Sequence, residues 1–184
     1  MARNQRQTTT QFQADLTVTV DDVGLVLRWR EDDSACVFLG PEGCTVHIDR
    51  PLACRLYPLG REVSETGTES WKHAPPHPET EGEYGVDGTI GDFIAGQDTA
   101  LYMQATDEYA GWVRRAFTLL AAKLVGQGDV PIDLFSVLLD MDAAIAAHCK
   151  QTAEQEPEEI EARKRLHLQI LDRQLEQFRG DGND

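Results

Sequence analysis

The sequence has no long apolar run. A helix needs about 18 consecutive apolar residues to cross a bilayer, and no stretch of this chain reaches that length, so we expect no membrane span. Its first residues, MARNQRQTTTQFQ, also lack the apolar segment of a secretory signal. These two absences favour a soluble, cytoplasmic protein.

Basic side chains are scarce. The chain has 17 Lys and Arg against 32 Asp and Glu, which gives a formal net charge of −15. A surface of that sign repels the phosphates of nucleic acids and anionic lipids. We therefore expect no nucleic-acid partner and no membrane partner, whereas a basic protein partner could bind the acidic helices.

Catalytic patterns are missing as well. The sequence contains no glycine-rich nucleotide motif, no Ser–His–Asp pattern and no paired-carboxylate signature. It contains no internal repeat either. These patterns therefore leave open whether the chain is an enzyme.

The chain does have enough apolar residues for a core. Hydrophobic residues make up 41% of its 184 residues, which suits one compact domain with some peripheral structure. The patterns predict a mainly α fold, with a small irregular α+β lobe that bears cysteines and a C-terminal helical bundle. The expected division is a flexible N-terminus at 1–14, a cysteine-cluster metal-binding lobe with a long Pro-rich loop at 15–90, a helical region at 91–179 and a tail at 180–184.

Short elements are expected in the first half of the chain. The β-branched stretch at 16–20 predicts a strand. The apolar spacing at 23–29, after two aspartates that suit a helix cap, predicts a helix. The sequence GPEG at 40–43 separates two apolar runs as a hairpin turn would. A helical turn is expected at 51–58, before a long loop at 61–91 that is rich in Gly, Pro, Glu and Thr.

The second half is expected to be helical. Thr89 suits the cap of a short helix at 90–97. Three longer helices follow, the second beginning at Pro131 and the third spanning about 157–178, each with an apolar stripe at helical spacing. The stripes comprise Tyr109, Trp112, Val113, Ala116, Phe117, Leu120 and Leu124; then Leu134, Val137, Leu138, Met141 and Ile145; then Leu168, Leu171, Leu175 and Phe178.

Three of the four cysteines are close together in the sequence. Cys36, Cys44 and Cys54 fall within nineteen residues, whereas Cys149 lies in an apolar helical run that predicts a buried thiol. In a reducing compartment, clustered thiols indicate metal binding or redox chemistry more than disulfides. Thiolates are soft ligands that select zinc, iron–sulfur clusters and cuprous copper. The spacing lacks the close Cys-x2-Cys pair of many zinc sites.

The residues around these thiols carry a further signal. The segment contains a cysteine before Phe-Leu, then Gly-Cys, then Arg-Pro-x-x-Cys-Arg-x-Tyr-Pro from Arg50 to Pro58. Over roughly 25 residues it resembles the YkgJ-like cysteine-cluster family, described as zinc- or iron-chelating domains and related to flagellin lysine N-methylase. The resemblance implies a bound metal, either zinc or iron, the latter including an iron–sulfur cluster.

This chain departs from the family at its N-terminus. The family carries further cysteines there, including an adjacent pair, and this chain has none. Either the sequence begins downstream of its natural start, or this member has lost those ligands. Histidine is the usual partner of cysteine in metal sites, so the candidate additional ligands are His47, His73 and His77. We expect His148 and His167 to be surface or helix-packing residues.

Three functions are compatible with these observations. The favoured one is a metal-binding protein with Cys36, Cys44 and Cys54 as ligands. The alternatives are a metal-dependent redox or methyl-transfer enzyme, and an acidic helical module that binds a protein and retains only a vestigial site.

Overall fold

The computed structural model describes residues 1–20, 24–64, 66–75, 87–124 and 133–180. The chain divides into two compact units. The first unit comprises Met1–Thr45 with Glu108–Asp184, and the second unit comprises Val46–Asp107. Helix α4 (Ala100–Leu124) contributes residues to both units.

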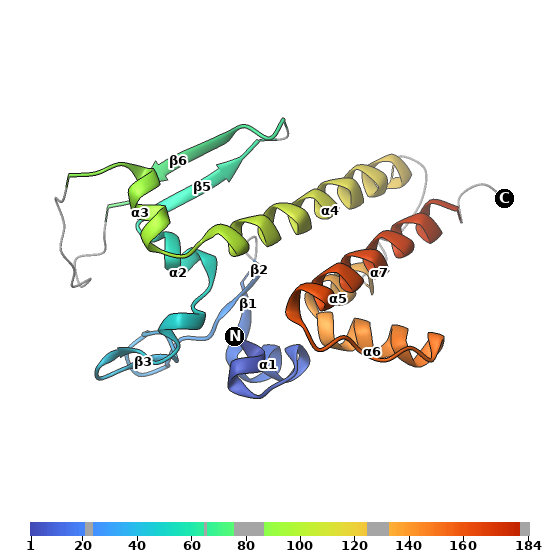
Figure 1. The fold of residues 1–184 in the computed structure, drawn as a ribbon, viewed down its shortest axis with the longest axis horizontal. Helices are drawn as coiled ribbons and strands as arrows, with labels where there is room; N and C mark the ends of the chain where they lie inside the picture. The colour runs from blue at the N-terminus through green and yellow to red at the C-terminus, as the bar shows by residue number, and fades with distance from the viewer. Residues whose placement is uncertain (21–23, 65, 76–86, 125–132, 181–184) are drawn as a thin grey trace. The chain divides into compact units, whose positions relative to one another are not determined.

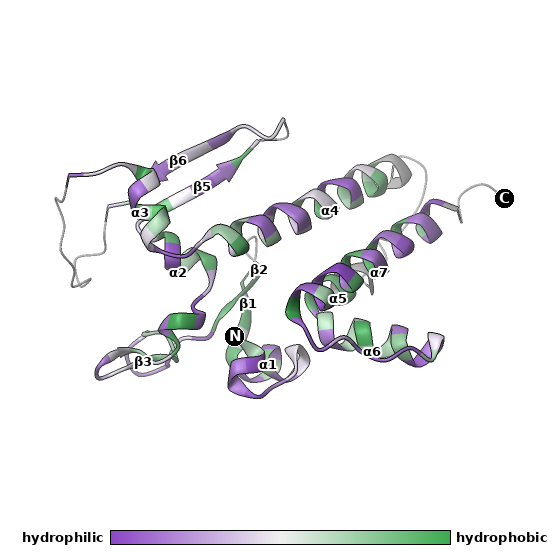
Figure 2. Ribbon diagram, viewed as in Figure 1, coloured by the Kyte–Doolittle hydropathy of each residue, from purple (hydrophilic) through white to green (hydrophobic). Residues whose placement is uncertain are grey.

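The protein is mainly helical, with three small antiparallel sheets of two strands each in its described parts (Figure 1). This confirms the predicted fold class. Purple and green residues alternate around α4 and α7 (Ile160–Gly180) in Figure 2, as expected for amphipathic helices. Among the described helices, none is long and apolar enough to cross a membrane.

The first unit begins with helix rather than with the predicted flexible segment. A 3₁₀-helix, η1 (Ala2–Gln5), precedes α1 (Thr9–Leu16). Thr8 and Gln11 form a capping box at the start of α1, since each side chain hydrogen-bonds the other's backbone N–H. Phe12 is buried and stacks on Phe38, so both a cap and a packing contact hold this segment.

A β-hairpin follows α1. The predicted strand is present as β1 (Thr17–Val20), which pairs with β2 (Gly24–Leu27). The helix predicted at 23–29 is wrong for its described part. Gly24 has φ +92°, a left-handed value that does not occur in an α-helix, and the residues after it pair across to β1. The cross-strand pairing therefore overrides the helical spacing of the apolar residues.

The predicted hairpin at GPEG is confirmed. Strand β3 (Leu39–Gly40) pairs with β4 (Gly43–Cys44), and the turn ends at Gly43 with φ +103°, which only glycine adopts readily.

The rest of the first unit is a helical bundle. It contains the later part of α4 with α5 (Asp133–Leu139), α6 (Met141–Thr152) and α7, and α6 and α7 lie side by side (Figure 1). Its described residues include two buried clusters, one of Trp112, Ala116, Leu171 and Leu175 and one of Ile145, Cys149 and Ile170. A single helix was expected to begin at Pro131, a residue outside the described ranges. Its described part is instead two helices, α5 and α6, separated at Asp140. Asp140 ends the run of α5 and caps α6 by accepting a hydrogen bond from Ala143.

The second unit contains η2 (His47–Asp49), α2 (Leu52–Leu56), β5 (Leu59–Val63), β6 (Glu69–His73) and α3 (Ile90–Gly96). The predicted helical turn and the helix capped by Thr89 are both present. The long loop predicted at 61–91 is wrong over 61–73, where β5 and β6 form a hairpin. Residues 76–86 of that loop lie outside the described residues.

Candidate thiol metal site

Cys36 and Cys44 lie on neighbouring turns of the first unit. Cys36 forms an isolated bridge with Trp29, and its carbonyl accepts a hydrogen bond from the N–H of Leu39 at 2.9 Å. Leu39 is in turn the β-ladder partner of Cys44. The bridge to Trp29 holds the backbone of Cys36 and the hairpin holds that of Cys44, and both cysteines are exposed.

A buried aromatic pair and an arginine support this hairpin. Phe38 is buried against Phe12, and its carbonyl accepts hydrogen bonds from the N–H and hydroxyl of Thr45. Arg30 donates to the carbonyl of Leu39 at 2.7 Å and pairs with Asp33. The pKa of Asp33 is lowered to about 2, chiefly by its hydrogen bond from Arg30. Aspartate at this position therefore stays ionised and holds the loop before Cys36.

Cys54 lies on α2 in the second unit and is also exposed. The neighbouring Arg55 is buried, with 4% of its surface exposed. Its guanidinium lies 4.2 Å from the centre of the Tyr102 ring, a cation–π distance. It also donates hydrogen bonds to four oxygens, those of Arg50 carbonyl at 3.1 Å, Gln97 carbonyl at 2.8 Å, Tyr102 hydroxyl at 2.9 Å and Ile48 carbonyl.

Arg55 therefore fixes the turn that presents Cys54. The neighbouring Arg50 is likewise held by neutral oxygens rather than by carboxylates. Arg50 donates to the side-chain oxygen of Gln97 at 2.7 Å and to the carbonyl of His47. Sequence reasoning missed Gln97 and Tyr102, because both lie more than forty positions from their partners.

The candidate histidine ligands are dispersed. His47 is exposed in η2, where its Nδ1 lies 3.2 Å from an Arg50 guanidinium nitrogen. His73 is exposed at the end of β6, and His77 lies outside the described residues. His148 is 3.6 Å from Glu154, and His167 is buried between helices, as a packing residue would be.

The described residues do not form a complete metal shell. Within these ranges, no group of three or more His, Cys, Asp or Glu side chains is placed to hold a metal ion. Cys36 and Cys44 belong to the first unit and Cys54 to the second. The chemistry of the donors fits zinc or iron, whereas a closed four-ligand site is not assembled from the residues that the structure describes.

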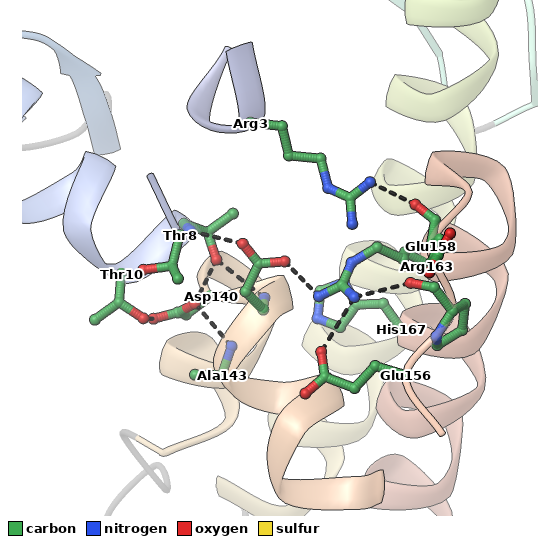
Figure 3. A network of polar contacts seen from close by, with 12 residues as sticks. Arg3, Thr8, Thr10, Asp140, Ala143, Glu156, Glu158, Arg163 and His167 are labelled. Carbon is green, nitrogen blue, oxygen red and sulfur yellow. Dashed lines mark hydrogen bonds and ion pairs between the residues drawn. The ribbon is translucent and has the colours of Figure 1, made fainter. Parts of the chain in front are cut away.

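A polar network that sequence reasoning missed lies in the first unit (Figure 3). Arg163 is 5% exposed and donates to Asp142 at 2.6 Å, Glu156 at 3.2 Å and the carbonyl of Pro157 at 3.0 Å. The carboxylate of Asp142 also accepts the N–H of Thr9 at 2.8 Å. The network therefore joins α1, α6 and α7. The one signal of it in the sequence is that charged residues occur among the apolar residues of these helices.

Two titratable groups in this region have shifted pKa values. Burial lowers the pKa of His167, and this outweighs its contact with the Val137 carbonyl and the nearby charges of Asp140 and Asp142. Burial alone would raise the pKa of Asp140, but hydrogen bonds from Thr10 and Thr9 lower it overall. His167 is therefore held neutral and Asp140 ionised at neutral pH.

Comparisons with protein-family models, with curated proteins and with solved structures found no match. The resemblance of residues 36–58 to a cysteine-cluster family therefore stays a prediction from the sequence.

Proposed function

We propose that this chain binds zinc or iron through the thiolates of Cys36, Cys44 and Cys54. The observation that carries the proposal is the exposure of these three thiols. Cysteine is among the most frequently buried residue types, and Cys149 follows that rule at 5% exposed. The three clustered cysteines instead present soft, solvent-accessible ligands from ordered turns.

The three thiolates leave at least one ligand to be supplied, since zinc in structural sites is four-coordinate. In this proposal a histidine supplies it, with His77, His73 and His47 as candidates. An iron–sulfur cluster would use the same thiolates, with a histidine in place of a fourth cysteine. Because the described donors are not gathered into one shell, metal binding is coupled to the final folding of the cysteine segment.

Metal analysis of the whole chain tests this proposal. Purified without oxygen, the protein should contain about one zinc or iron equivalent, and visible absorption would distinguish an iron–sulfur cluster from zinc. Cys36→Ser, Cys44→Ser and Cys54→Ser should each lower the metal content strongly.

Cys149→Ala serves as the matched control, because it removes a buried thiol outside the segment and should keep the metal. A folded protein that contains neither metal and takes up neither from solution contradicts the proposal. Equal metal content in the Cys54→Ser and Cys149→Ala variants contradicts it as well.

A further inference from the structure

A groove of about 680 Å³ lies in the first unit, and no cysteine is among the residues that line it. Its walls come from η1 and α1 on one side and from α6 and the start of α7 on the other. Small-molecule sites in proteins typically have volumes of about 300–1,000 Å³. The size of the groove therefore suits a small molecule rather than a macromolecule.

Three arginines line this groove: Arg3, Arg6 and Arg163. Arg163 is neutralised by Asp142 and Glu156. Among the described residues, no carboxylate lies within ion-pairing distance of the guanidinium of Arg3 or Arg6. Arg3 donates to the backbone carbonyl of Glu158 and reaches from η1 toward Arg163 (Figure 3).

Acidic side chains outnumber basic ones by 32 to 17 in this chain, yet three arginines line this one groove. The groove gathers two unneutralised guanidiniums beside a third that is buried. Guanidinium forks bind carboxylates and phosphates with two parallel hydrogen bonds, so the charge of the groove is suited to an anion.

The walls also contain hydrogen-bonding capacity that the described residues leave unused. The Nε of Arg163 and the Oε1 of Gln7 are buried and have no hydrogen-bond partner there. The orientation of the Gln7 amide is set by its Nε2, which donates to Asp15 at 2.9 Å. Both atoms are enclosed within the walls, where hydrogen bonds are costly to leave unmade.

We propose that this groove binds a small hydroxylated anion, a carboxylate or a phosphate ester. The unpaired guanidiniums of Arg3 and Arg6 would hold the anionic group, and Thr8, Thr10 and Gln11, which also line the groove, would face its hydroxyls. The carboxylates of Asp142 and Glu156 and the net charge of −15 act against polyanions. This site is independent of the proposed metal.

Calorimetric titration of the full chain tests the proposal, with glycerol 3-phosphate and glycerate as anionic probes and glycerol as the uncharged control. We expect saturable binding of at least one anion with one site per chain and no binding of glycerol. The two anionic arms tell a phosphate ligand from a carboxylate ligand. Raising the salt concentration should weaken the binding, because it rests on charge.

Variants locate the binding. Arg3→Gln and Arg6→Gln should each weaken it by about tenfold or more, the loss expected when a hydrogen bond to a charged group is removed. Arg173→Gln removes the same charge from an exposed position on α7 that does not line the groove and should change nothing. Thermal melting checks that the variants fold. Absence of saturable binding by both anions overturns the proposal, as does unchanged binding in a folded R3Q/R6Q double variant.

Discussion

Arg55 shows how a single residue can organise a segment that has little apolar core. Its buried guanidinium contacts neutral oxygens and the Tyr102 ring. A guanidinium presents five N–H donors in a planar fork, whereas lysine presents three on a point charge. The fork of Arg55 joins η2, the start of α2 and the end of α3, and so determines where Cys54 is presented.

The first prediction concerns this residue. Arg55→Lys keeps the charge but cannot reach four oxygens at once, so it leaves buried carbonyls without donors. We expect the free energy of unfolding to fall by about 2 kcal/mol, measured by urea denaturation. Arg173→Lys, at an exposed site on α7, is the control and should have no effect. Equal midpoints for the two variants would show that the buried fork is dispensable.

The second prediction concerns His167. Burial lowers its pKa below the ordinary value of 6.5, so the unfolded chain takes up a proton at a higher pH than the folded chain does. Stability from the neutral imidazole is therefore fully present above pH 6.5 and is lost as the pH falls below that value toward the folded-state pKa.

His167→Gln should flatten this loss, measured as the free energy of unfolding between pH 7.5 and pH 5. The glutamine side chain stays neutral throughout and can still donate to the Val137 carbonyl, which lies 2.8 Å from Nε2 in the native protein. His148→Gln, next to Glu154 near the end of α6, is the comparison, because it removes a histidine that does not contact Val137. An identical pH dependence in all three proteins would contradict the assignment to His167.

At the scale of elements, the sequence predicted correctly those turns and helix ends that depend on residues close to one another in the chain. The GPEG hairpin and the helix capped by Thr89 depend on residues within a few positions of each other, and both are present. The predictions were wrong where the secondary structure of a segment depends on its pairing with another segment. The residues of β2 have helical spacing, but Gly24 and pairing with β1 make them a strand.

The same distinction applies to the candidate site. The placement of Cys44 on a hairpin and Cys54 on a helical turn could be predicted, because turn residues and prolines mark both. The contacts of Arg55 with Gln97 and Tyr102, and the network around Arg163, could not. They depend on packing between elements that the sequence keeps far apart.

Hairpin β5–β6 is held by a contact between Arg61 of β5 and Asp107 of α4. The side chain of Arg61 is 10% exposed and forms two hydrogen bonds with Asp107, at 2.7 and 2.8 Å, and one with Glu69 at 2.7 Å. The hydrogen bonds to Asp107 raise the pKa of Arg61 further above its already high value. The glycine, threonine and glutamate content that predicted a loop is therefore offset by an ion pair with the beginning of α4.

The third prediction tests this anchor. Asp107→Asn removes the charge and one of the paired acceptors, so the hairpin should open more often. Because the Asp107 side chain is 45% exposed, solvent screening limits the loss to about 1 kcal/mol. Amide hydrogen exchange in residues 59–63 and 69–73 should accelerate. Glu62→Gln, which removes the exposed pair with Lys72, should leave exchange unchanged; faster exchange in that variant alone would reverse the assignment.

At the scale of the whole molecule, the net charge of −15 affects every part of the chain. Like charges distributed over a folded protein repel one another and favour expansion. The ion pairs at the surface act in the opposite direction, but exposed pairs contribute only about 0–1 kcal/mol each. The pairs of Arg61 and Arg163 are better protected, since these side chains are 10% and 6% exposed.

These magnitudes predict that moderate salt stabilises the protein. Raising the ionic strength from about 0.01 M to about 0.15 M shortens the screening length from about 30 Å to about 8 Å, which weakens long-range repulsion more than it weakens protected contact pairs. The melting temperature should therefore rise. Replacing three exposed carboxylates, Glu31, Glu42 and Glu176, by glutamine changes the net charge from −15 to −12 and should reduce the dependence on salt. A melting temperature that falls with salt would mean that attractive ion pairs outweigh the excess negative charge.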